Sequence, residues 1–497
     1  WRNASNKTGT GGAPQRTRVR SAVRNLFLLK VVNLQLHFWD TSRILLVACG
    51  LLGVGPSRTY TQEGQQGCTV QSVTFHGWPA ERMSNRWVTL TVVPKLGGRL
   101  MQAAFGRHEY LFVNPRYYGA YFPPSEGADK GKWFNYGGDK DWPLPEGGQD
   151  ESHWRGDSDT LDDGIYTAKV LSSGKLCSIL LQGPPDIETG LQYSRQVSID
   201  SESPRISFHA VMRNASGHRI RWSIQSVSQY NTADPDKPGS YNHDFWAFTP
   251  TNPSSAFNRQ FDVHSGPVDH PSYRVRDGKM FALHWSYLEG EVGIDSPAGW
   301  VALVDGLSHY AMVERMTWGS HAQYPDRSST IFYINGPQLR LDGQGMPHMT
   351  SADVLATPYY MEAELNSPLV ELKPGDSYSF DTEWFPTRAT PSLTGTSDAG
   401  VINEALTATL GSNGVQLAGS FGVFYSGRLK ARFYSFSGVP LGSVPVVEVS
   451  PLKLVSLHQT VEAPAGSGRV SLHLVDATGS DKGGLGEVPI SGAGAKR

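Results

Sequence analysis

Apolar and polar residues alternate with a period of two along much of the chain from about Arg86 onward. Val88, Leu90 and Val92 would share one face of a strand, with threonines on the other face. A second run places apolar residues at 206, 208, 210 and 212, with polar Ser207 and His209 between them. Similar runs recur up to residue 385, separated by turn signals such as Lys373-Pro-Gly-Asp. Many short strands at regular spacing predict an all-β fold built from large sheets.

The pattern divides the chain into three predicted parts. Residues 1–57 form a basic leader and a signal-like segment, residues 68–388 form the main β domain, and residues 401–490 form a small β-sandwich module. A stretch rich in Thr, Ser, Pro and Gly at 386–400 separates the last two. Long connections at 115–163 and 231–276 are rich in Pro, Gly, Asn and Asp, and loops of this length inside a domain are commonly functional.

The segment 44–55 is apolar, follows Arg43 and ends in small residues, which is typical of a secretory signal. It is too short to span a bilayer. We therefore expect a secreted or periplasmic protein with cleavage near Ser57. Lipidation at Cys49 is the second interpretation, and a buried apolar segment the third. Removal of the signal would leave Cys68 and Cys177, which could form one disulfide in an oxidising compartment.

Charge and cysteine usage exclude several classes of partner. The net charge is -2 and 18% of the 497 residues are charged, so no basic surface for nucleic acid or anionic membrane is indicated. No Cys/His spacing suggests zinc. Acidic loop residues between Asp139 and Asp163 could hold calcium, but a solvated loop explains them better. We expect no nucleic-acid partner, no transmembrane helix, no metal and no cofactor.

Residues 133–146 combine tryptophans, an amide and charges around the pair Gly137-Gly138. Sugars stack their C–H faces on aromatic rings and bond their hydroxyls to amides and charged groups. The stretch therefore suggests a sugar site, although each tryptophan alone is more typical of core packing. The candidate binding residues here are Asn135, Asp139, Lys140 and Trp142, with Trp133 and Trp154 as further stacking candidates; Trp222, on a strand, suits either role.

Several motifs resemble one family. Residues 92–100, 135–143, 222–225, 324–326 and 360–376 are similar to galactose mutarotase-like proteins, specifically to an uncharacterised bacterial domain family, DUF4380. The resemblance covers roughly residues 70–388. It implies a β-supersandwich, in which two large antiparallel sheets carry a carbohydrate site on a concave face. The superfamily includes aldose 1-epimerases and domains of glycoside hydrolases and polysaccharide lyases, so the reaction stays open.

Two glutamates are the candidates for proton transfer. The resemblance makes Glu362 the counterpart of the mutarotase base. Glu362 and Glu364 are two residues apart in a predicted strand, so both side chains should leave the same face. Neighbouring carboxylates raise each other's pKa, which suits a general acid or base. The alternative is a solvated or arginine-paired strand face.

The catalytic acid is harder to find. The strand that carries a histidine in mutarotases corresponds to residues 220–231, which have Gln225 and Ser226 there and no histidine. Gln225 can bind a hydroxyl but cannot protonate one. His153 is our candidate for a replacement acid, with His243 and Lys140 as alternatives, although each is more typical of a surface residue.

Two arginines are further substrate-binding candidates. Arg195 shares a predicted strand face with apolar Leu191, Tyr193 and Val197, so it needs a partner or lies at a pocket edge. Its guanidinium fits a uronate or the carboxylates of Glu362 and Glu364. A structural salt bridge is the alternative. Arg99 lies in the glycine-rich opening 92–100 of the resemblance.

Together these features predict an exported protein that binds or acts on a sugar or oligosaccharide. If it is catalytic, we expect epimerase-like acid/base chemistry. The alternatives are a non-catalytic glycan-binding protein, or a polysaccharide lyase or hydrolase with an accessory β module.

Overall fold

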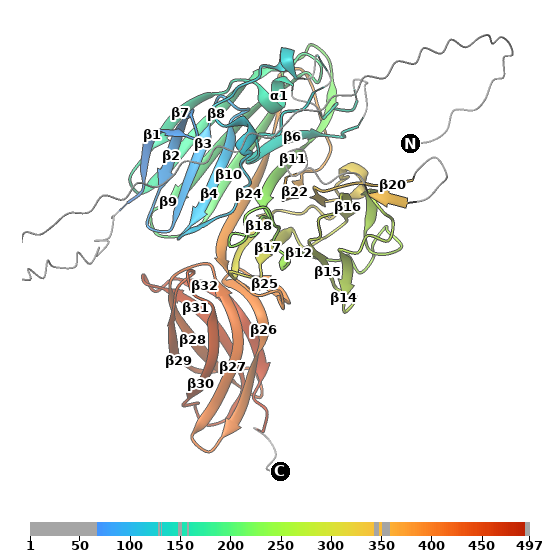
Figure 1. Ribbon diagram of the computed structural model, residues 1–497. Coiled ribbons are helices and arrows are strands. Elements are labelled where there is room, and N and C mark those ends of the chain that lie inside the picture. Colours follow the sequence, from blue (N-terminus) through green and yellow to red (C-terminus); the bar gives the residue numbers. More distant parts are fainter. Residues whose placement is uncertain are drawn as a thin grey trace, which may run out of the picture. The chain divides into compact units, whose positions relative to one another are not determined.

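The computed structural model describes residues 67–127, 130, 132–147, 152–156, 159–341, 347–349 and 358–492. The predicted leader 1–57, with Cys49, lies outside them. Nearly all regular structure in the described part is antiparallel β-strand (Figure 1), which confirms the all-β prediction. The exceptions are α1 (Thr160–Asp163) and the 3-10 turns η1 (Pro115–Tyr117), η2 (Pro124–Glu126) and η4 (Pro325–Arg327).

A twelve-stranded sheet carries most of the candidate site residues. Its strands follow the order β1 (Thr69–Phe75), β2 (Trp78–Ser84), β3 (Val88–Val93), β4 (Arg99–Phe105), β6 (Asp139–Leu144), β11 (Ile220–Asn231), β22 (Tyr360–Asn366), β19 (Thr330–Ile334), β16 (Gly290–Ile294), β13 (Asp262–Ser265). Two short strands are added beside this path, β5 (His108–Glu109) on β4 and β23 (Val370–Leu372) on β11.

A ten-stranded sheet covers one face of the first sheet. Its order is β14 (Tyr273–Arg276), β15 (Met280–His284), β12 (Phe245–Pro250), β17 (Trp300–Asp305), β18 (Tyr310–Met316), β24 (Ser377–Arg388), β10 (Ile206–Asn214), β9 (Leu191–Asp200), β8 (Leu176–Pro185), β7 (Thr167–Ser172). The strands β20 (Leu339–Leu341) and β21 (Pro347–Met349) form a separate pair.

The main hydrophobic core lies between these two sheets. Alternation directs one face of each strand inward: on β9, Leu191, Tyr193, Val197 and Ile199 are buried, as is Arg195, and the residues between these five are partly exposed. On β22 the inward residues are Met361, Ala363 and Leu365. The alternation therefore predicted an all-β fold of large sheets, because one face of each strand packs into the core.

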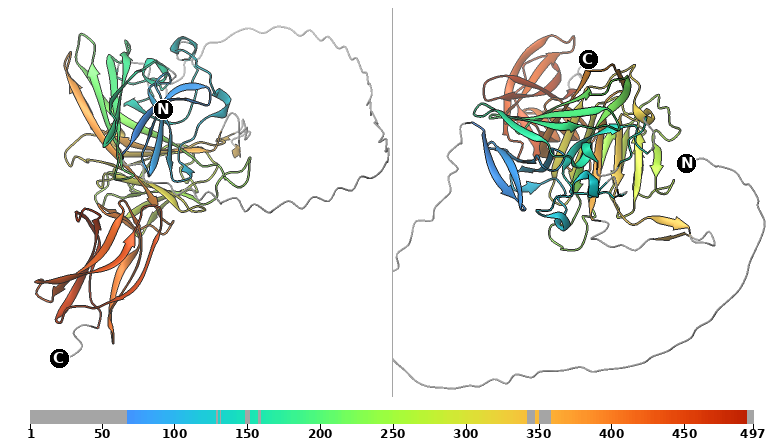
Figure 2. Two further views of the ribbon diagram at one scale, coloured as in Figure 1. Left: turned by 90° about the vertical axis from the view of Figure 1, so that its left-hand side faces the viewer. Right: turned by 90° about the horizontal axis from the view of Figure 1, so that it is seen from above.

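Strands after residue 394 form two four-stranded sheets with their own buried cluster (Figures 1 and 2). The first has the order β25 (Gly395–Ser397), β26 (Gly400–Gly411), β27 (Gly414–Val423), β30 (Val455–Val461). The second has the order β29 (Pro440–Val449), β28 (Gly427–Ser435), β31 (Ser467–Asp476), β32 (Asp481–Pro489). Since residues 62–497 belong to one compact unit, the division into two domains stays a prediction.

Cys68 and Cys177 form a disulfide, with 5.9 Å between their Cα atoms. Cys68 immediately precedes β1 of the twelve-stranded sheet, and Cys177 lies on β8 of the ten-stranded sheet. The bond therefore links the two large sheets. Among the described residues, none of the helices has the length and apolar character needed to cross a membrane.

Candidate functional site

The site lies on the face of the twelve-stranded sheet that points away from the ten-stranded sheet. On β22 the core residues alternate with Tyr360, Glu362 and Glu364, which therefore share this outward face. The side chains of both glutamates are almost fully buried, with residue exposures of 5% and 6%. The spacing argument thus placed the two carboxylates correctly relative to each other.

The neighbouring strand β11 supplies an amide to each carboxylate. Its residues Gln229 and Val227 stand opposite Glu362 and Glu364. Gln229 Nε2 donates a hydrogen bond to Glu362 Oε1 at 2.6 Å, and Gln225 Nε2 donates one to Glu364 Oε2. The side-chain oxygens of both glutamines are buried and have no hydrogen-bond partner. Each glutamine can therefore still accept a hydrogen bond.

On the other side of β11, strand β6 places Lys140 and Trp142 on the same face. Lys140 Nζ lies 3.7 Å from Glu362 Oε1 and 4.0 Å from the centroid of the Trp142 ring. This nitrogen is buried and makes no hydrogen bond. The sequence predicted a loop around residue 139, whereas the structure has a strand from Asp139, and strand geometry fixes the directions of these side chains.

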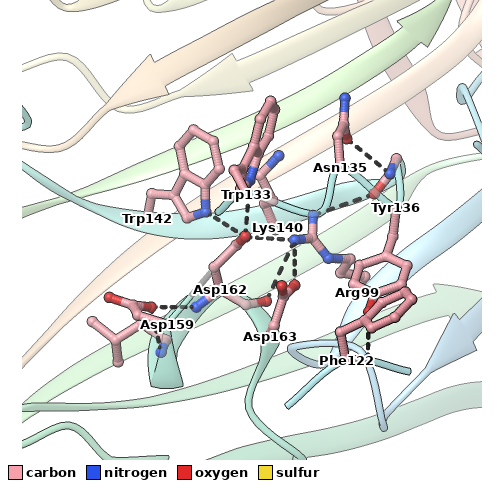
Figure 3. A network of polar contacts seen from close by, with 12 residues as sticks. Arg99, Phe122, Trp133, Asn135, Tyr136, Lys140, Trp142, Asp159, Asp162 and Asp163 are labelled. Atoms are coloured by element: carbon pink, nitrogen blue, oxygen red, sulfur yellow. Dashed lines mark hydrogen bonds and ion pairs between the residues drawn. The ribbon is translucent and has the colours of Figure 1, made fainter. Parts of the chain in front are cut away.

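Asp162 of α1 fixes both site tryptophans (Figure 3). Its Oδ1 accepts a hydrogen bond from Trp142 Nε1 at 2.8 Å, and its Oδ2 accepts one from Trp133 Nε1 at 3.1 Å. The carboxylate of Asp159 caps α1 by accepting hydrogen bonds from the backbone nitrogens of residues 161 and 162. Of the two indoles, Trp133 is the more exposed, at 36%, and is available for stacking.

Arg99 is the first residue of β4 and is fully buried. Its Nη2 is 2.5 Å from Asp162 Oδ1 and 3.1 Å from Asp163 Oδ1 (Figure 3). Nearby Asn135 uses its side-chain oxygen to accept a hydrogen bond from the Gly137 backbone nitrogen. The charge of Arg99 is already paired with α1, and the predicted contact between Arg99 and substrate stays a prediction. The side chain of Asn135 lies close enough to Tyr360, on the outward face, for a hydrogen bond between the two side chains.

Three further predicted binding residues face the interior between the sheets. Asp139 bonds Arg195, with 2.8 Å between Asp139 Oδ2 and Arg195 Nη2. Trp222 is 1% exposed and donates its Nε1 hydrogen bond to Thr189 O at 3.2 Å. A ligand on the outward face cannot reach these side chains. The structural salt bridge, our alternative for Arg195, agrees with this position, as core packing does for Trp222.

His153 lies between β6 and α1 in sequence and is partly exposed. Its Nδ1 is 3.1 Å from Ser152 Oγ. The contacts described for His153 do not connect it to Glu362 or Glu364, so its role as the acid stays a prediction.

Besides Gln229, sequence reasoning missed three polar residues that more distant strands bring to the outward face. Tyr333 of β19 stands opposite Glu362, and Glu291 of β16 stands opposite Tyr333. His264 of β13 places its Nδ1 3.0 Å from Glu291 Oε1. Glycine at 293 leaves room for this imidazole, since a Cβ atom there would lie 2.6 Å from His264 Nε2. Only the pairing of strands far apart in sequence brings these residues to the site, and their own patterns carry no signal of it.

The carboxyl groups of Glu362 and Glu364 differ in the charges that surround them and shift their pKa values. Burial raises the pKa of Glu362, and the Lys140 ammonium opposes that rise. Burial also raises the pKa of Glu364, and there the carboxylates of Glu362 and Glu291 add to the rise. Burial lowers the pKa of Lys140. Lys140 therefore offsets part of the effect of burial at Glu362, whereas Glu364 has further carboxylates beside it, so of the two Glu364 more strongly favours the protonated form.

The pKa values of Glu146 and His264 are also raised. The protein atoms packed around the carboxyl group of Glu146, which follows β6, raise its pKa to about 8, although the residue as a whole is exposed. Burial would lower the pKa of His264, but the hydrogen bond and charge of Glu291 outweigh it and raise that pKa. In the part of the chain that the structure describes, no group of three or more His, Cys, Asp or Glu residues is arranged to hold a metal ion.

No family model matches the chain, and no curated protein matches it. Among solved structures it is similar to a galactose mutarotase-like protein from Lactobacillus casei (11% identity, TM-score 0.40, 62% of this chain and 99% of that one). It is also similar to a galactose mutarotase-like protein from Clostridium acetobutylicum (11% identity, TM-score 0.38, 65% and 99%).

A third similar structure is a TPR-domain containing protein from Parabacteroides distasonis (13% identity, TM-score 0.40), where the match covers 62% of this chain and 47% of that one. This chain thus spans about half of that protein. The similarities to galactose mutarotase-like proteins concern the fold alone. The narrower assignment to DUF4380 stays a prediction.

Proposed function

We propose that this protein binds a sugar on the outward face of the twelve-stranded sheet and interconverts its anomers by acid/base catalysis. The observation that carries the proposal is the pair Glu362 and Glu364: the two share one buried face, and only Glu362 has a cation, Lys140, within 4.0 Å. Two carboxyl groups with different surroundings suit the roles of base and acid. Trp133 and Trp142 border them and offer aromatic surfaces for the sugar ring.

In the proposed step, the Glu362 carboxylate takes the proton of the sugar O1 hydroxyl, and Glu364 donates its proton to the ring oxygen. The bond between C1 and the ring oxygen breaks, and its electron pair goes to that oxygen. O1 becomes the aldehyde oxygen of the open chain. Rotation about C1–C2 and the reverse proton transfers close the ring to the other anomer. Residues two apart on a strand are separated by about 6.6 Å, so one sugar can lie between their carboxyl groups.

In this proposal Glu364 is the catalytic acid, for which the sequence analysis found no histidine in the corresponding strand. The strand 220–231 offers no histidine as the acid, and the carboxyl group of Glu364 lies next to Gln225 of that same strand. Its raised pKa favours the protonated form that an acid needs.

A non-catalytic glycan-binding protein is the second candidate. It is favoured by the hydrogen bonds that Gln225 and Gln229 already donate to the two carboxyl groups. Such bonds hold the glutamates in place as hydroxyl acceptors without any proton transfer.

We also propose that the protein is exported. The disulfide between Cys68 and Cys177 supports this, because disulfides persist mainly in oxidising compartments.

Polarimetry with freshly dissolved α-anomers of neutral and amino hexoses tests the catalytic proposal, and tryptophan fluorescence measures binding in parallel. We expect the wild type to accelerate mutarotation, and Glu362→Gln to abolish the acceleration while binding persists. Glu404→Gln is the matched control, because Glu404 is exposed in the C-terminal sheets. Binding without acceleration would favour the glycan-binding protein, and absence of binding would contradict both candidates.

A further inference from the structure

The outward face gathers several carboxyl groups. Glu362 and Glu364 are buried there, Glu291 stands opposite Tyr333 on the neighbouring strand, and Glu146 follows β6. The cationic groups on the same face are Lys140 and His264. Arg99 does not add a free positive charge, since Asp162 and Asp163 already pair with it.

The carboxyl groups differ in whether a cation accompanies them. Glu362 has Lys140 at 3.7 Å, and Glu291 has His264 at 3.0 Å. Glu364 has the neutral amide of Gln225 as its hydrogen-bond partner, and no Lys, Arg or His nitrogen of the described residues lies within 4.0 Å of it. A buried carboxylate without a cation is costly unless a partner arrives or it takes up a proton.

Unpartnered atoms beside Glu364 indicate that a ligand completes the arrangement. The side-chain oxygens of Gln225 and Gln229 are buried without hydrogen-bond partners, although their residues are only 2% and 0% exposed. Both atoms accept hydrogen bonds and cannot donate them. A ligand that satisfies them must bring N–H or O–H donors.

These requirements discriminate between classes of sugar. A uronate could accept a hydrogen bond from the unpartnered Lys140 nitrogen, but it would bring a further negative charge beside Glu362 and Glu364, and Arg195, which we predicted to bind it, faces the interior between the sheets. A neutral sugar would satisfy the glutamine oxygens but leave Glu364 without a cation. A sugar with an ammonium group would satisfy both.

We propose that the ligand is an amino sugar, whose ammonium group lies against Glu364, which releases its proton when this ligand binds, and whose hydroxyls donate to Gln225 and Gln229. This inference rests on the proposed function, because it specifies the class of sugar bound at the same site. A charged hydrogen bond formed out of water favours the amino sugar over the neutral sugar by about tenfold or more.

Isothermal titration calorimetry at pH 6.5 with matched sugars tests this proposal. The gluco, galacto and manno series each offer a hexosamine and a hexuronate that differ from the parent hexose in one group. The β-1,4-linked trimers of glucosamine and glucose extend the comparison to oligosaccharides. We expect the amino sugar of at least one series to bind at least tenfold more tightly than its neutral counterpart, and the uronate to bind most weakly.

Glu364→Gln should remove this preference, and Glu404→Gln should leave it unchanged. The N-acetylated form of the preferred amino sugar provides a test without any variant, because it keeps the nitrogen but removes its charge, and its affinity should fall to that of the neutral hexose of the same series or below. A uronate that binds as tightly as the amino sugar, or an unchanged preference in Glu364→Gln, would overturn the inference and leave the sugar site standing. If no sugar binds, the proposed function falls together with it.

Discussion

Strand β6 presents two polar clusters on its opposite faces. Asp139 and Asp141 point toward the ten-stranded sheet, where they pair with Arg195; Lys140 and Trp142 point the other way. In the inward cluster the arginine lies within 4.0 Å of both aspartates. Each cluster also contains a carboxyl group with no Lys, Arg or His nitrogen of the described residues within 4.0 Å: Glu314 in the inward cluster, which accepts a hydrogen bond from Tyr230, and Glu364 in the outward cluster, beside glutamine oxygens without donors. Similar residue types thus stabilise the fold on one face and, by our proposal, receive a ligand on the other.

Removing the inward arginine should have the largest effect on stability. Arg195→Met leaves the carboxyl groups of Asp139 and Asp141 buried without a cation, so we expect the free energy of unfolding to fall by about 3–5 kcal/mol in urea denaturation. As a control, adding Asp139→Asn and Asp141→Asn to Arg195→Met should recover a large part of this loss. A loss below about 1 kcal/mol for Arg195→Met would show that the pairing contributes little.

Breaking the disulfide should lower the stability of the protein without changing sugar binding at the outward cluster. The double variant Cys68→Ser with Cys177→Ser should lose about 2–4 kcal/mol, because the cross-link restricts the unfolded chain between residues 109 apart in sequence. Thermal unfolding under non-reducing conditions measures the loss. Sugar binding well below the unfolding temperature should not change, and loss of binding by a folded variant would mean that the link also shapes the site.

The inward cluster should also make stability depend on pH. Burial raises the pKa of Glu314 to about 8, and Tyr230 donates a hydrogen bond to its carboxyl group at 2.5 Å. Asp139 and Arg195 are the other charged groups that act on it. Because its folded pKa exceeds the ordinary value near 4.5, the folded protein keeps a proton that the unfolded chain releases. Its contribution to stability therefore falls as pH rises from about 4.5 to 8.

Glu314→Gln should remove this loss. We expect the stability of the variant relative to wild type to rise by about 1–3 kcal/mol between pH 5 and pH 8, measured by urea denaturation at both values. An equal pH dependence in variant and wild type would contradict a raised pKa at Glu314. Glu404→Gln, at an exposed position, should leave the dependence unchanged.

On the outward face, Glu364→Gln should have the smallest effect on stability. At pH 5 the raised pKa of Glu364 favours its protonated form, so the amide replaces a neutral carboxyl group and we expect a change within about 1 kcal/mol, in contrast to Arg195→Met. Affinity for the preferred sugar should nevertheless fall by about tenfold. A loss of several kcal/mol would place Glu364 among the structural charges.

The fold and part of the site could be predicted from the sequence because strand alternation is a local signal. It placed Glu362 and Glu364 on one face and Met361, Ala363 and Leu365 in the core. It also put Arg195 on the same face as Leu191 and Val197, which the structure places between the sheets.

The sequence analysis was wrong in predicting a turn where the structure has strand β6, and it missed residues that only strand pairing brings to the site. Residues after Gly138 read as a turn, so the opposite directions of Asp139 and Lys140 were not recognised. Glu291 and His264 reach the site through the pairing of β13, β16, β19 and β22, and no single-strand pattern reveals which strands pair.

A crystal structure of the protein with the amino sugar that calorimetry selects tests the central claim most directly. We predict that the sugar lies on the outward face, with its nitrogen within hydrogen-bond distance of Glu364 and hydroxyls bonded to Gln225 and Gln229. The opposing possibility is a groove of about 420 Å³ on the solvent face of the ten-stranded sheet, lined in part by Ser207, His209 and Asp381. A sugar bound in that groove, with the outward face empty, would contradict the account.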